Sequence, residues 1–463
     1  MRAAIASASC ALLLVACGAA QERSAPDPPA ALARVGAQVD VSNEAGRQRE
    51  VSIAVGPSDD AVILGGSNSR PGSTMRAYAS TDGGARWTSA ALPVPPASTS
   101  DGCAADPAVG IDRAGRQYFA FGWISPCTFF GRASIFVATR ADAHAPWLTP
   151  AAPVAPHDTN AFDDKPALAI DNSPQSRHPN RVYVAWTRDG GRSGDLILVS
   201  HSDDGVKWSA PARANHTFSQ GLSYASLAVG GDGDVYVAWD DWIAGALYLT
   251  RSNDGGDHFE PERFVAHAVP GTLRCRPYGT AIPAQARTCV RANPIVSVDR
   301  STGPFAGRTY VTYARIGANG AEDVFVSAFD AALQPLAGFP RRVNRPDGFV
   351  RSDQFWPASA VDQATGALWV CFYDTRGDPR RVKTFYSCTA STDGGRSWSR
   401  AVRAASVASN ERQAAAASGP YGGEYGDYEG LAVTNGVAHP IWTDSRRLST
   451  RAEEIYTTAL RRP

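Results

Sequence analysis

Short apolar runs bounded by glycine, proline or aspartate recur along most of the chain, and helical periodicity is nearly absent. Runs of this length and type predict β-strands and an all-β chain. The runs that open each repeat are 51–55, 107–112, 166–171, 226–229, 294–299, 357–362 and 430–433. A repeat of roughly 60 residues indicates a β-propeller, in which four-stranded sheets surround an axis.

Each opening run is followed by a second and a third predicted strand. The second strands include 181–186, 235–239, 309–313 and 437–442, and the third include 196–199 and 324–326. Seven openings favour seven four-stranded antiparallel blades, and six remain open if the first repeat is not a full blade. The last repeat stops after a third strand at 454–460, whereas an extra strand at 37–41 precedes the first repeat. We expect this N-terminal strand to pair with the last blade and close the ring.

An octapeptide between the third and fourth strands carries a recurring polar pattern, Ser-x-Asp-x-Gly-x-x-aromatic. It occurs at 391–398, 80–87 and 252–259, and in a decayed form at 201–208. The aspartate can accept hydrogen bonds from its own turn, glycine supplies a positive φ, and the aromatic ring packs into the adjoining core. The repeats at 141–147 and 330–335 lack a clean copy.

This octapeptide resembles the Asp box of the sialidase-like, or BNR-repeat, β-propellers, and the resemblance covers most of the chain. It implies a ligand site near the axis, on the face opposite the Asp boxes. Known sialidases have six blades, so a count of seven would depart from those enzymes. The Arg-Ile-Pro signature of the family's first blade is also missing, since 68–71 reads Asn-Ser-Arg-Pro.

The resemblance implies three arginines that clamp a substrate carboxylate, a tyrosine nucleophile activated by a glutamate, and an aspartate that supplies the proton. Candidates are chosen by their position on the expected ligand face. The clamp candidates are Arg188, Arg376 and Arg446, and the acid candidates are Asp106 and Asp164. The nucleophile pair is Tyr428 or Tyr425 with Glu424 or Glu429. Trp239 and Trp356 are expected to stack on a sugar.

A structural alternative remains open for two of the arginines. Asp374 with Arg376, and Asp444 with Arg446, recur in equivalent loops after the second strand. Such recurrence is also what ion pairs that fix the loops would produce.

The N-terminal region reads as an export signal. Residues 11–16 are apolar but too short to span a bilayer, and 14–17 read Leu-Val-Ala-Cys, which looks like a bacterial lipobox. The predicted divisions are a signal peptide at 1–17 with lipidation at Cys17, a flexible tether at 18–36 and the propeller at 37–463. The expected location is the cell envelope, at the outer membrane or the periplasmic face.

Six cysteines remain in the chain besides Cys10 and Cys17, and an even number after an export signal indicates disulfides. Closeness in sequence favours the pairs Cys103–Cys127, Cys275–Cys289 and Cys371–Cys388. The spacing of Cys and His does not fit a metal site, and we expect no cofactor.

The formal net charge is zero and basic residues are not clustered, which argues against nucleic acid as a partner. The sequence therefore predicts a monomeric, lipid-anchored propeller that acts on or binds glycans. The alternative is a non-catalytic scaffold that binds an envelope protein.

Overall fold

The computed structural model describes residues 32–70, 75–93, 95, 102–128, 131–149, 151–154, 162–268, 280–344, 351–412, 425–448 and 452–462. Within these ranges the chain is almost wholly β-strand and turn, as the sequence predicts, with one short 3-10 helix at Gly191–Ser193. No helix in these ranges is long and apolar enough to cross a membrane.

The strands form consecutive antiparallel groups, and within a group each strand pairs with the next along the chain. Six of the groups have four strands in the described ranges, and the last has three of its own. A short parallel pairing of Phe162 with Ala133 also joins the second group to the third. The first groups are β3 (Arg47–Val55), β4 (Ile63–Arg70), β5 (Arg76–Ser80) and β6 (Thr88–Ala91); then β7 (Cys103–Ile111), β8 (Gln117–Ser125), β9 (Arg132–Arg140) and β10 (Ala152–Pro153). Next come β11 (Phe162–Ile170), β12 (Val182–Asp189), β13 (Leu196–Ser202) and β14 (Ala212–Arg213); then β15 (Leu222–Val229), β16 (Val235–Asp241), β17 (Ala246–Ser252) and β18 (Arg263–His267).

The later groups continue the same order. They are β21 (Ile295–Val298), β22 (Thr309–Ile316), β23 (Glu322–Phe329) and β24 (Arg341–Arg342); then β25 (Gln354–Asp362), β26 (Ala367–Asp374), β27 (Phe385–Ser391) and β28 (Val402–Arg403). The last holds β29 (Gly430–Thr434), β30 (Val437–Asp444) and β31 (Glu454–Thr457). A separate hairpin, β19 (Thr280–Ile282) and β20 (Gln285–Val290), lies between β18 and β21.

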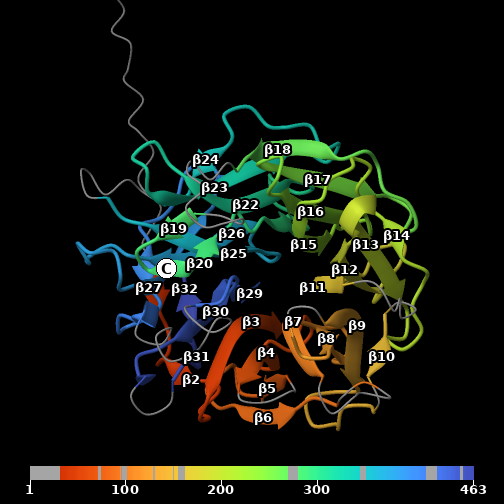
Figure 1. The fold of residues 1–463 in the computed structure, drawn as a ribbon, viewed down its shortest axis with the longest axis horizontal. Helices are drawn as coiled ribbons and strands as arrows, with labels where there is room; N and C mark the ends of the chain where they lie inside the picture. The colour runs from red at the N-terminus through yellow and green to blue at the C-terminus, as the bar shows by residue number, and fades with distance from the viewer. Residues whose placement is uncertain are drawn as a thin grey trace, which may run out of the picture.

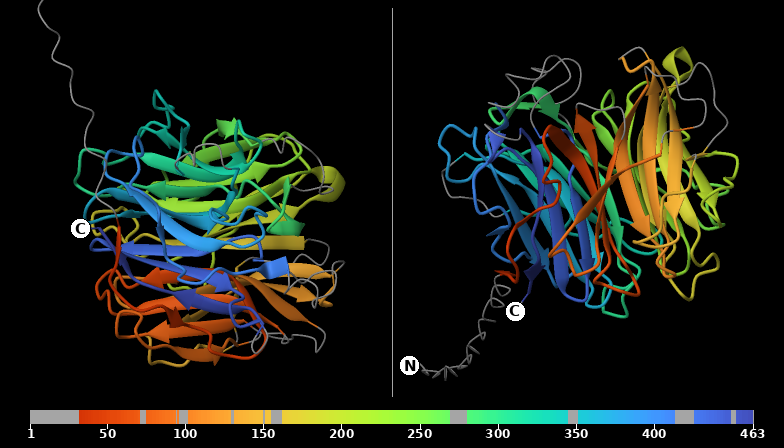
Figure 2. Two further views of the ribbon diagram at one scale, coloured as in Figure 1. Left: turned by 90° about the vertical axis from the view of Figure 1, so that its left-hand side faces the viewer. Right: turned by 90° about the horizontal axis from the view of Figure 1, so that it is seen from below.

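The sheets are arranged around a common centre, with the first strand of each group innermost (Figure 1). The first strands contact one another in the order β3, β7, β11, β15, β21, β25 and β29, and β29 contacts β3. Seen from the side, the sheets stand next to one another with their faces packed together (Figure 2). This is the radial packing expected of a propeller.

The N-terminal segment joins the last group. Val39 and Asp40 of β2 (Val39–Asp40) pair with β31, and β1 (Ala33–Arg34) pairs with β32 (Leu460–Arg461). The strand expected at 37–41 thus overlaps β2, and β1 falls inside the predicted tether at 18–36.

The cores lie between neighbouring sheets. Trp186 of β12, for example, belongs to a cluster with Ile135 and Val137 of β9 and is fully buried. Trp239, Trp369 and Trp442 lie on other second strands and are also fully buried. Burial of a large ring on these four second strands therefore stabilises the packing of one sheet on the next.

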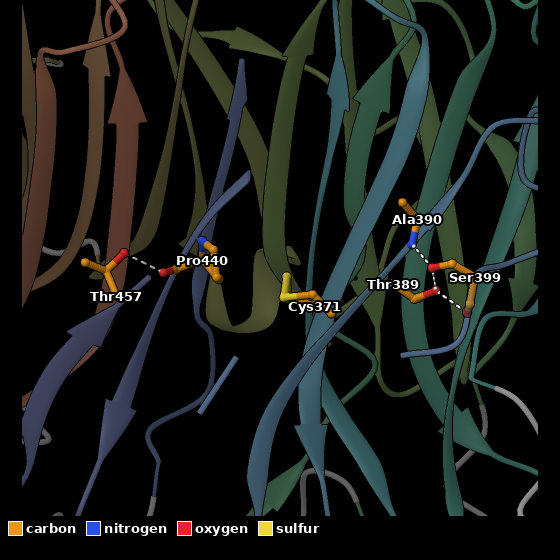
Figure 3. Close-up of a disulfide and its surroundings, with 7 residues drawn as sticks. Cys371, Thr389, Ala390, Ser399, Pro440 and Thr457 are labelled. Atoms are coloured by element: carbon orange, nitrogen blue, oxygen red, sulfur yellow. Dashed lines mark hydrogen bonds between the residues drawn. A yellow bond between two sulfur atoms is a disulfide. The ribbon is translucent and has the colours of Figure 1, made fainter. Parts of the chain in front are cut away.

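The Asp boxes form the turns that the sequence predicts. In the copy at 391–398, the Asp393 carboxylate accepts hydrogen bonds from the Arg396 and Ser397 N–H groups at 3.0 and 2.8 Å. Gly394 and Gly395 have φ of 71° and 85°. The adjacent backbone is fastened by Ser399, whose oxygens accept bonds from Thr389 Oγ1 at 2.8 Å and Ala390 N–H at 3.1 Å (Figure 3).

The two repeats without a clean copy still turn on an aspartate. Asp142 accepts N–H bonds from His144 and Ala145, and Asp330 accepts them from Ala332 and Gln334. Only part of the box is therefore needed to make the turn.

Two of the predicted disulfides are present. Cys103 is bonded to Cys127, and Cys371 is bonded to Cys388, which lies directly opposite it on the neighbouring strand (Figure 3). The prediction for Cys275 lies outside the described residues. Cys10 and Cys17 lie outside them as well.

Candidate functional site

One position near the start of the first strand has an unusual backbone. Its residues have positive φ although none is glycine: Glu50 (55°), Asp106 (61°), Lys165 (50°), Tyr224 (55°), Asn293 (44°) and Trp356 (47°). The pairing register shifts around this position in β3, β7, β11, β15 and β25, which marks a β-bulge. Bulges re-aim a side chain, and unfavourable φ values cluster at functional sites.

Three of these residues gather at the axis with two residues that precede β29. We name as the axial cluster Asp106, Lys165, Tyr224, Asp427 and Tyr428. Lys165 Nζ lies 2.7 Å from Asp427 Oδ2 and 3.5 Å from Asp106 Oδ1. The Tyr224 hydroxyl donates to Asp427 Oδ2 at 2.6 Å, and the Tyr428 hydroxyl donates to Asp106 Oδ1 at 3.1 Å. The Lys165 ammonium also lies over both tyrosine rings, 5.0 and 5.3 Å from their centroids.

A cavity of about 270 Å³ adjoins the axial cluster. Its lining comes from the first strands of all the groups and includes Lys165, Tyr224 and Tyr428. Its other lining residues are apolar except for five polar ones, which are Ser52, Ser226, Asn293, Ser359 and Glu429. A cavity with apolar walls and a few convergent polar groups is the usual form of a small-molecule site.

Two residues hold the cluster from the side of β3 and β4. Asn68 donates a hydrogen bond through Nδ2 to Glu50 Oε2, and its Oδ1 accepts the Asp106 N–H at 3.0 Å. Asn68 lies in the string 68–71, which was compared above with an Arg-Ile-Pro signature. Its side chain links Glu50 to Asp106. It was not among the predicted site residues.

Carboxyl groups around the axis have opposite pKa shifts. Burial raises the pKa of Asp164 to about 7, and nearby Asp106 and Asp427 add to the effect. Burial, with Asp427, raises the pKa of Glu50 to about 8. Burial opposes ionisation of Asp427 as well, but Lys165 and the Tyr224 hydroxyl outweigh it and lower the pKa of Asp427. A separation of this kind is how proteins keep one carboxyl as an acid and another as a base.

An arginine that the sequence did not single out flanks the cluster. The Arg291 guanidinium lies 4.6 Å from the centroid of the Tyr224 ring, and Nη2 is 3.3 Å from Asp240 Oδ2. Burial raises the pKa of Asp240 to about 6, although Arg291 opposes the shift. Sequence reasoning missed Arg291 and Lys165 because neither belongs to a motif.

The structure brings together three of the predicted catalytic residues. Asp106 and Tyr428 are hydrogen-bonded, and the nearby charge of Asp106 adds to the effect of burial in raising the pKa of Asp164. The predicted pairing of Tyr428 with Glu429 is not what the structure shows. Glu429 instead accepts the Tyr373 hydroxyl at 2.6 Å and the Thr443 N–H at 3.1 Å. Burial raises the pKa of Tyr428 well above its usual value, which opposes a role as a ready nucleophile.

Tyr425, the other tyrosine candidate for the nucleophile pair, does not join the cluster. Tyr425 is fully buried and accepts a hydrogen bond from Thr384 Oγ1 at 2.5 Å. Glu424 lies outside the described residues.

The three predicted clamp arginines are each engaged by an aspartate. Arg188 makes two bonds to Asp163, at 2.7 and 2.8 Å. Arg376 and Arg446 pair with Asp374 and Asp444 in their own loops, at 2.5 and 2.6 Å. These two pairs match the alternative interpretation, in which ion pairs fix the loops, because each arginine is bonded inside its own loop.

One of these arginines also contacts a segment beside an outer strand. Arg446 Nη1 donates to Gln38 Oε1 at 2.7 Å, just before β2. All three predicted clamp guanidinium groups are therefore engaged by groups of the chain itself.

Neither predicted stacking residue is exposed. Trp239 and Trp356 have 1% and 0% of their surface accessible. Trp356 lies in a core cluster with Ile282 and Ala284, which come from the β19–β20 hairpin. That hairpin could not be predicted from the repeat, and it covers the ring that we expected to face solvent. Within the described part of the chain, no group of acidic, His or Cys residues is arranged to hold a metal.

No family model matches the chain, and no curated protein matches it significantly. Many solved structures match it in fold. The leech intramolecular trans-sialidase complexed with 2,7-anhydro-Neu5Ac is 10% identical with a TM-score of 0.50, over 74% of this chain and 67% of that one. A protein of unknown function from Dyadobacter fermentans is 16% identical with a TM-score of 0.48, over 74% and 94%.

An α-L-arabinofuranosidase of family GH93 from Fusarium graminearum is 10% identical with a TM-score of 0.46, over 93% of this chain and 98% of that one. At these identities the trans-sialidase match supports a sialidase-like propeller fold, and it says nothing about the reaction.

Proposed function

We propose that the axial cavity binds the end of a glycan and that the surrounding carboxyl groups hydrolyse its glycosidic bond. The observation that carries this proposal is that Lys165, Tyr224 and Tyr428 line one cavity of about 270 Å³, with Asp427 and Asp106 bound directly to these lining residues. A cavity of this size suits one sugar ring better than an extended chain.

The two carboxyl groups with opposite pKa shifts supply the chemistry. Asp164 remains protonated up to about pH 7 and can give a proton to the leaving oxygen. Asp427 stays ionised and can act on the opposite side, as base or nucleophile. Lys165 holds Asp427 in place, and Tyr428 holds Asp106.

Turnover of 4-nitrophenyl glycosides by the full-length protein, over a panel that includes a sialoside, tests the proposal. Asp164→Asn and Asp427→Asn should each abolish turnover of the active substrate. Asp142→Asn, in an exposed turn, is the matched control and should retain it. Unchanged turnover in either axial variant would refute the assignment.

The second candidate is non-catalytic binding at the same face. It is favoured by the absence of the arginine clamp and of the expected Tyr428–Glu429 pair. Saturable glycan binding without turnover of any glycoside would support it, as would capture of one envelope protein that the axial variants fail to bind.

The architecture and cellular setting belong to the same proposal. The closed sequence of contacts from β3 to β29 supports seven blades, and the pairing of β2 with β31 supports closure by the N-terminal strand. The 14–17 string supports cleavage and acylation at Cys17 and a monomer anchored at the cell envelope. Labelling with a radioactive fatty acid, lost in Cys17→Ala, tests the anchor.

A further inference from the structure

The numbers of positive and negative side chains at the axis do not suit the binding of an acidic sugar. Lys165 and Arg291 are the cations described above at the axis, and each is already paired, with Asp427 and Asp240 respectively. Against them stand three carboxylates, Asp106 and the two partners Asp427 and Asp240. Burial raises the pKa of Glu50 to about 8 and that of Asp164 to about 7, so these two groups add less negative charge at neutral pH. A ligand carboxylate would find an acidic excess there, and like charges brought together in a buried site repel strongly.

One buried carboxylate oxygen without a hydrogen-bond partner indicates which ligand group the site can bind. Asp427 Oδ1 is buried and has no hydrogen-bond partner among the described residues, while Oδ2 takes both Lys165 and Tyr224. An ionised carboxylate oxygen only accepts hydrogen bonds. A sugar hydroxyl can donate to it, whereas a second carboxylate cannot.

From these observations we propose that the axial cavity is selective for an uncharged sugar residue, with a hydroxyl group donated to Asp427, and excludes sialic and uronic acids. This inference rests on the proposed function and specifies its substrate class. The arginines that would otherwise attract an acidic sugar are neutralised by Asp163, Asp374 and Asp444. The pairing of Arg188 is bidentate, which leaves its planar donor edge occupied.

Matched sugar pairs isolate the charge from the shape of the ring. Methyl glucoside with methyl glucuronide, and methyl galactoside with methyl galacturonide, differ only at C6, and the methyl glycoside of N-acetylneuraminic acid is added to the set. Binding is measured by calorimetry on the full-length protein at pH 7 and at fixed ionic strength. We expect a neutral member to bind about tenfold or more tighter than its acidic counterpart.

Two variants place the selectivity at the axis. Asp427→Asn removes the charge and the acceptor-only oxygen, and should reduce the preference for the neutral member at least severalfold. Arg376→Ala, which removes a guanidinium paired with Asp374, should leave the preference unchanged. The wild-type comparison stands by itself if Asp427→Asn fails to fold.

The outcomes are distinguishable. Equal or tighter binding of the uronic or sialic acid would overturn the inference and leave the proposed function intact. Binding of no sugar in the set, together with no turnover of any glycoside, would overturn the proposed function and the inference with it. Preference for the neutral sugars that survives in Asp427→Asn would refute the role of that oxygen.

Discussion

The hydroxyl of Tyr428 donates a hydrogen bond to Asp106, 322 positions earlier in the chain. Asp106 lies in β7, which opens the second group, and Tyr428 lies just before β29 of the last group; β3 lies between those strands in the sequence of contacts. The axial cluster is therefore completed only when the last group packs beside the first.

Tyr428→Phe tests whether the tyrosine is a nucleophile or a positioning residue. If its role is to hold Asp106, loss of one hydrogen bond of about 1 kcal/mol should lower kcat by about tenfold or less. A nucleophile could not be replaced by phenylalanine, so activity at background level in a folded Tyr428→Phe protein would contradict our interpretation. Steady-state kinetics with circular dichroism as a folding check measures this.

Activity should fall as the pH rises through about 7. Asp164 acts as an acid only while protonated, and burial raises its pKa to about 7, in surroundings that include Lys165, Asp106, Asp427 and Arg291. Asp427, whose pKa is lowered, should stay ionised well below neutrality. The profile of kcat/KM should thus have an alkaline limb near pH 7. A limb unmoved by Lys165→Met would count against this assignment, because Lys165 lowers the pKa of Asp164.

Stability should also decrease with pH, and Glu50→Gln should reduce that decrease. Burial raises the pKa of Glu50 to about 8 in the folded protein from its ordinary value of 4.5, so the folded state binds more protons between these values. The free energy of unfolding must then fall across this window as the pH rises. Chemical denaturation at pH 5, 7 and 9 measures the slope. An identical slope in Glu50→Gln would contradict the prediction.

Arg188→Ala should destabilise the protein by about 3 kcal/mol, because it leaves the buried carboxylate of Asp163 without its partner. The side chain of Asp163 is 4% exposed. Arg192→Ala, at a nearby exposed position, is the control and should change the stability by less than about 0.5 kcal/mol. Urea denaturation of both variants separates the outcomes. A large loss of ligand binding in Arg188→Ala without loss of stability would instead support the predicted role of Arg188 in binding a substrate carboxylate.

Gly205→Ala should cost more stability than Gly436→Ala, although both glycines have positive φ. Backbone strain alone, at a φ of 78° with nothing within 4 Å of an added Cβ, should cost about 1 kcal/mol at Gly436. At Gly205, with a φ of 74°, the added Cβ would also lie 2.5 Å from Tyr118 Cε1 of the preceding group of strands, and the total cost should be about 3 kcal/mol. Thermal unfolding compares the two variants. Equal losses of stability would refute close packing of the turn at Gly205 against Tyr118.

Loss of the Cys371–Cys388 disulfide should lower the free energy of unfolding by about 3 kcal/mol. The two cysteines are fully buried and 17 positions apart, so their bond closes a short loop in the unfolded chain. The double variant Cys371→Ala/Cys388→Ala should fold with the same activity and a lower urea midpoint. An unchanged midpoint would contradict the prediction.

The fold was predictable because its signals are local. Each Asp box, such as the one around Asp393, carries its own hydrogen-bond partners within a few residues, and Cys371 lies opposite Cys388 as the hairpin spacing required. The first strands were predictable from their apolar runs. The β19–β20 hairpin interrupts the repeat, and no periodicity indicated that it would cover Trp356.

The site was predictable in part, because the strand order indicates which residues share a face but not which side chains bind one another. Asp106, Asp164 and Tyr428 were named from the sequence, and the structure brings them close together. Whether Arg376 points to the axis or to Asp374 depends on rotamers and on charges in neighbouring strands. Lys165 belongs to no motif, so its ion pairs with Asp427 and Asp106 could not be predicted from the sequence.

At the bulge position shared by the first strands, the backbone conformation is the same from group to group although the side chain is not. Glu50, Asp106, Lys165 and Tyr224 share one backbone conformation and differ completely in side chain. Because the turn octapeptides and the inter-sheet rings lie elsewhere, a change of residue at this position alters what the channel presents while the architecture stays the same. Libraries that vary these four sites together would therefore explore new specificities on an unaltered framework.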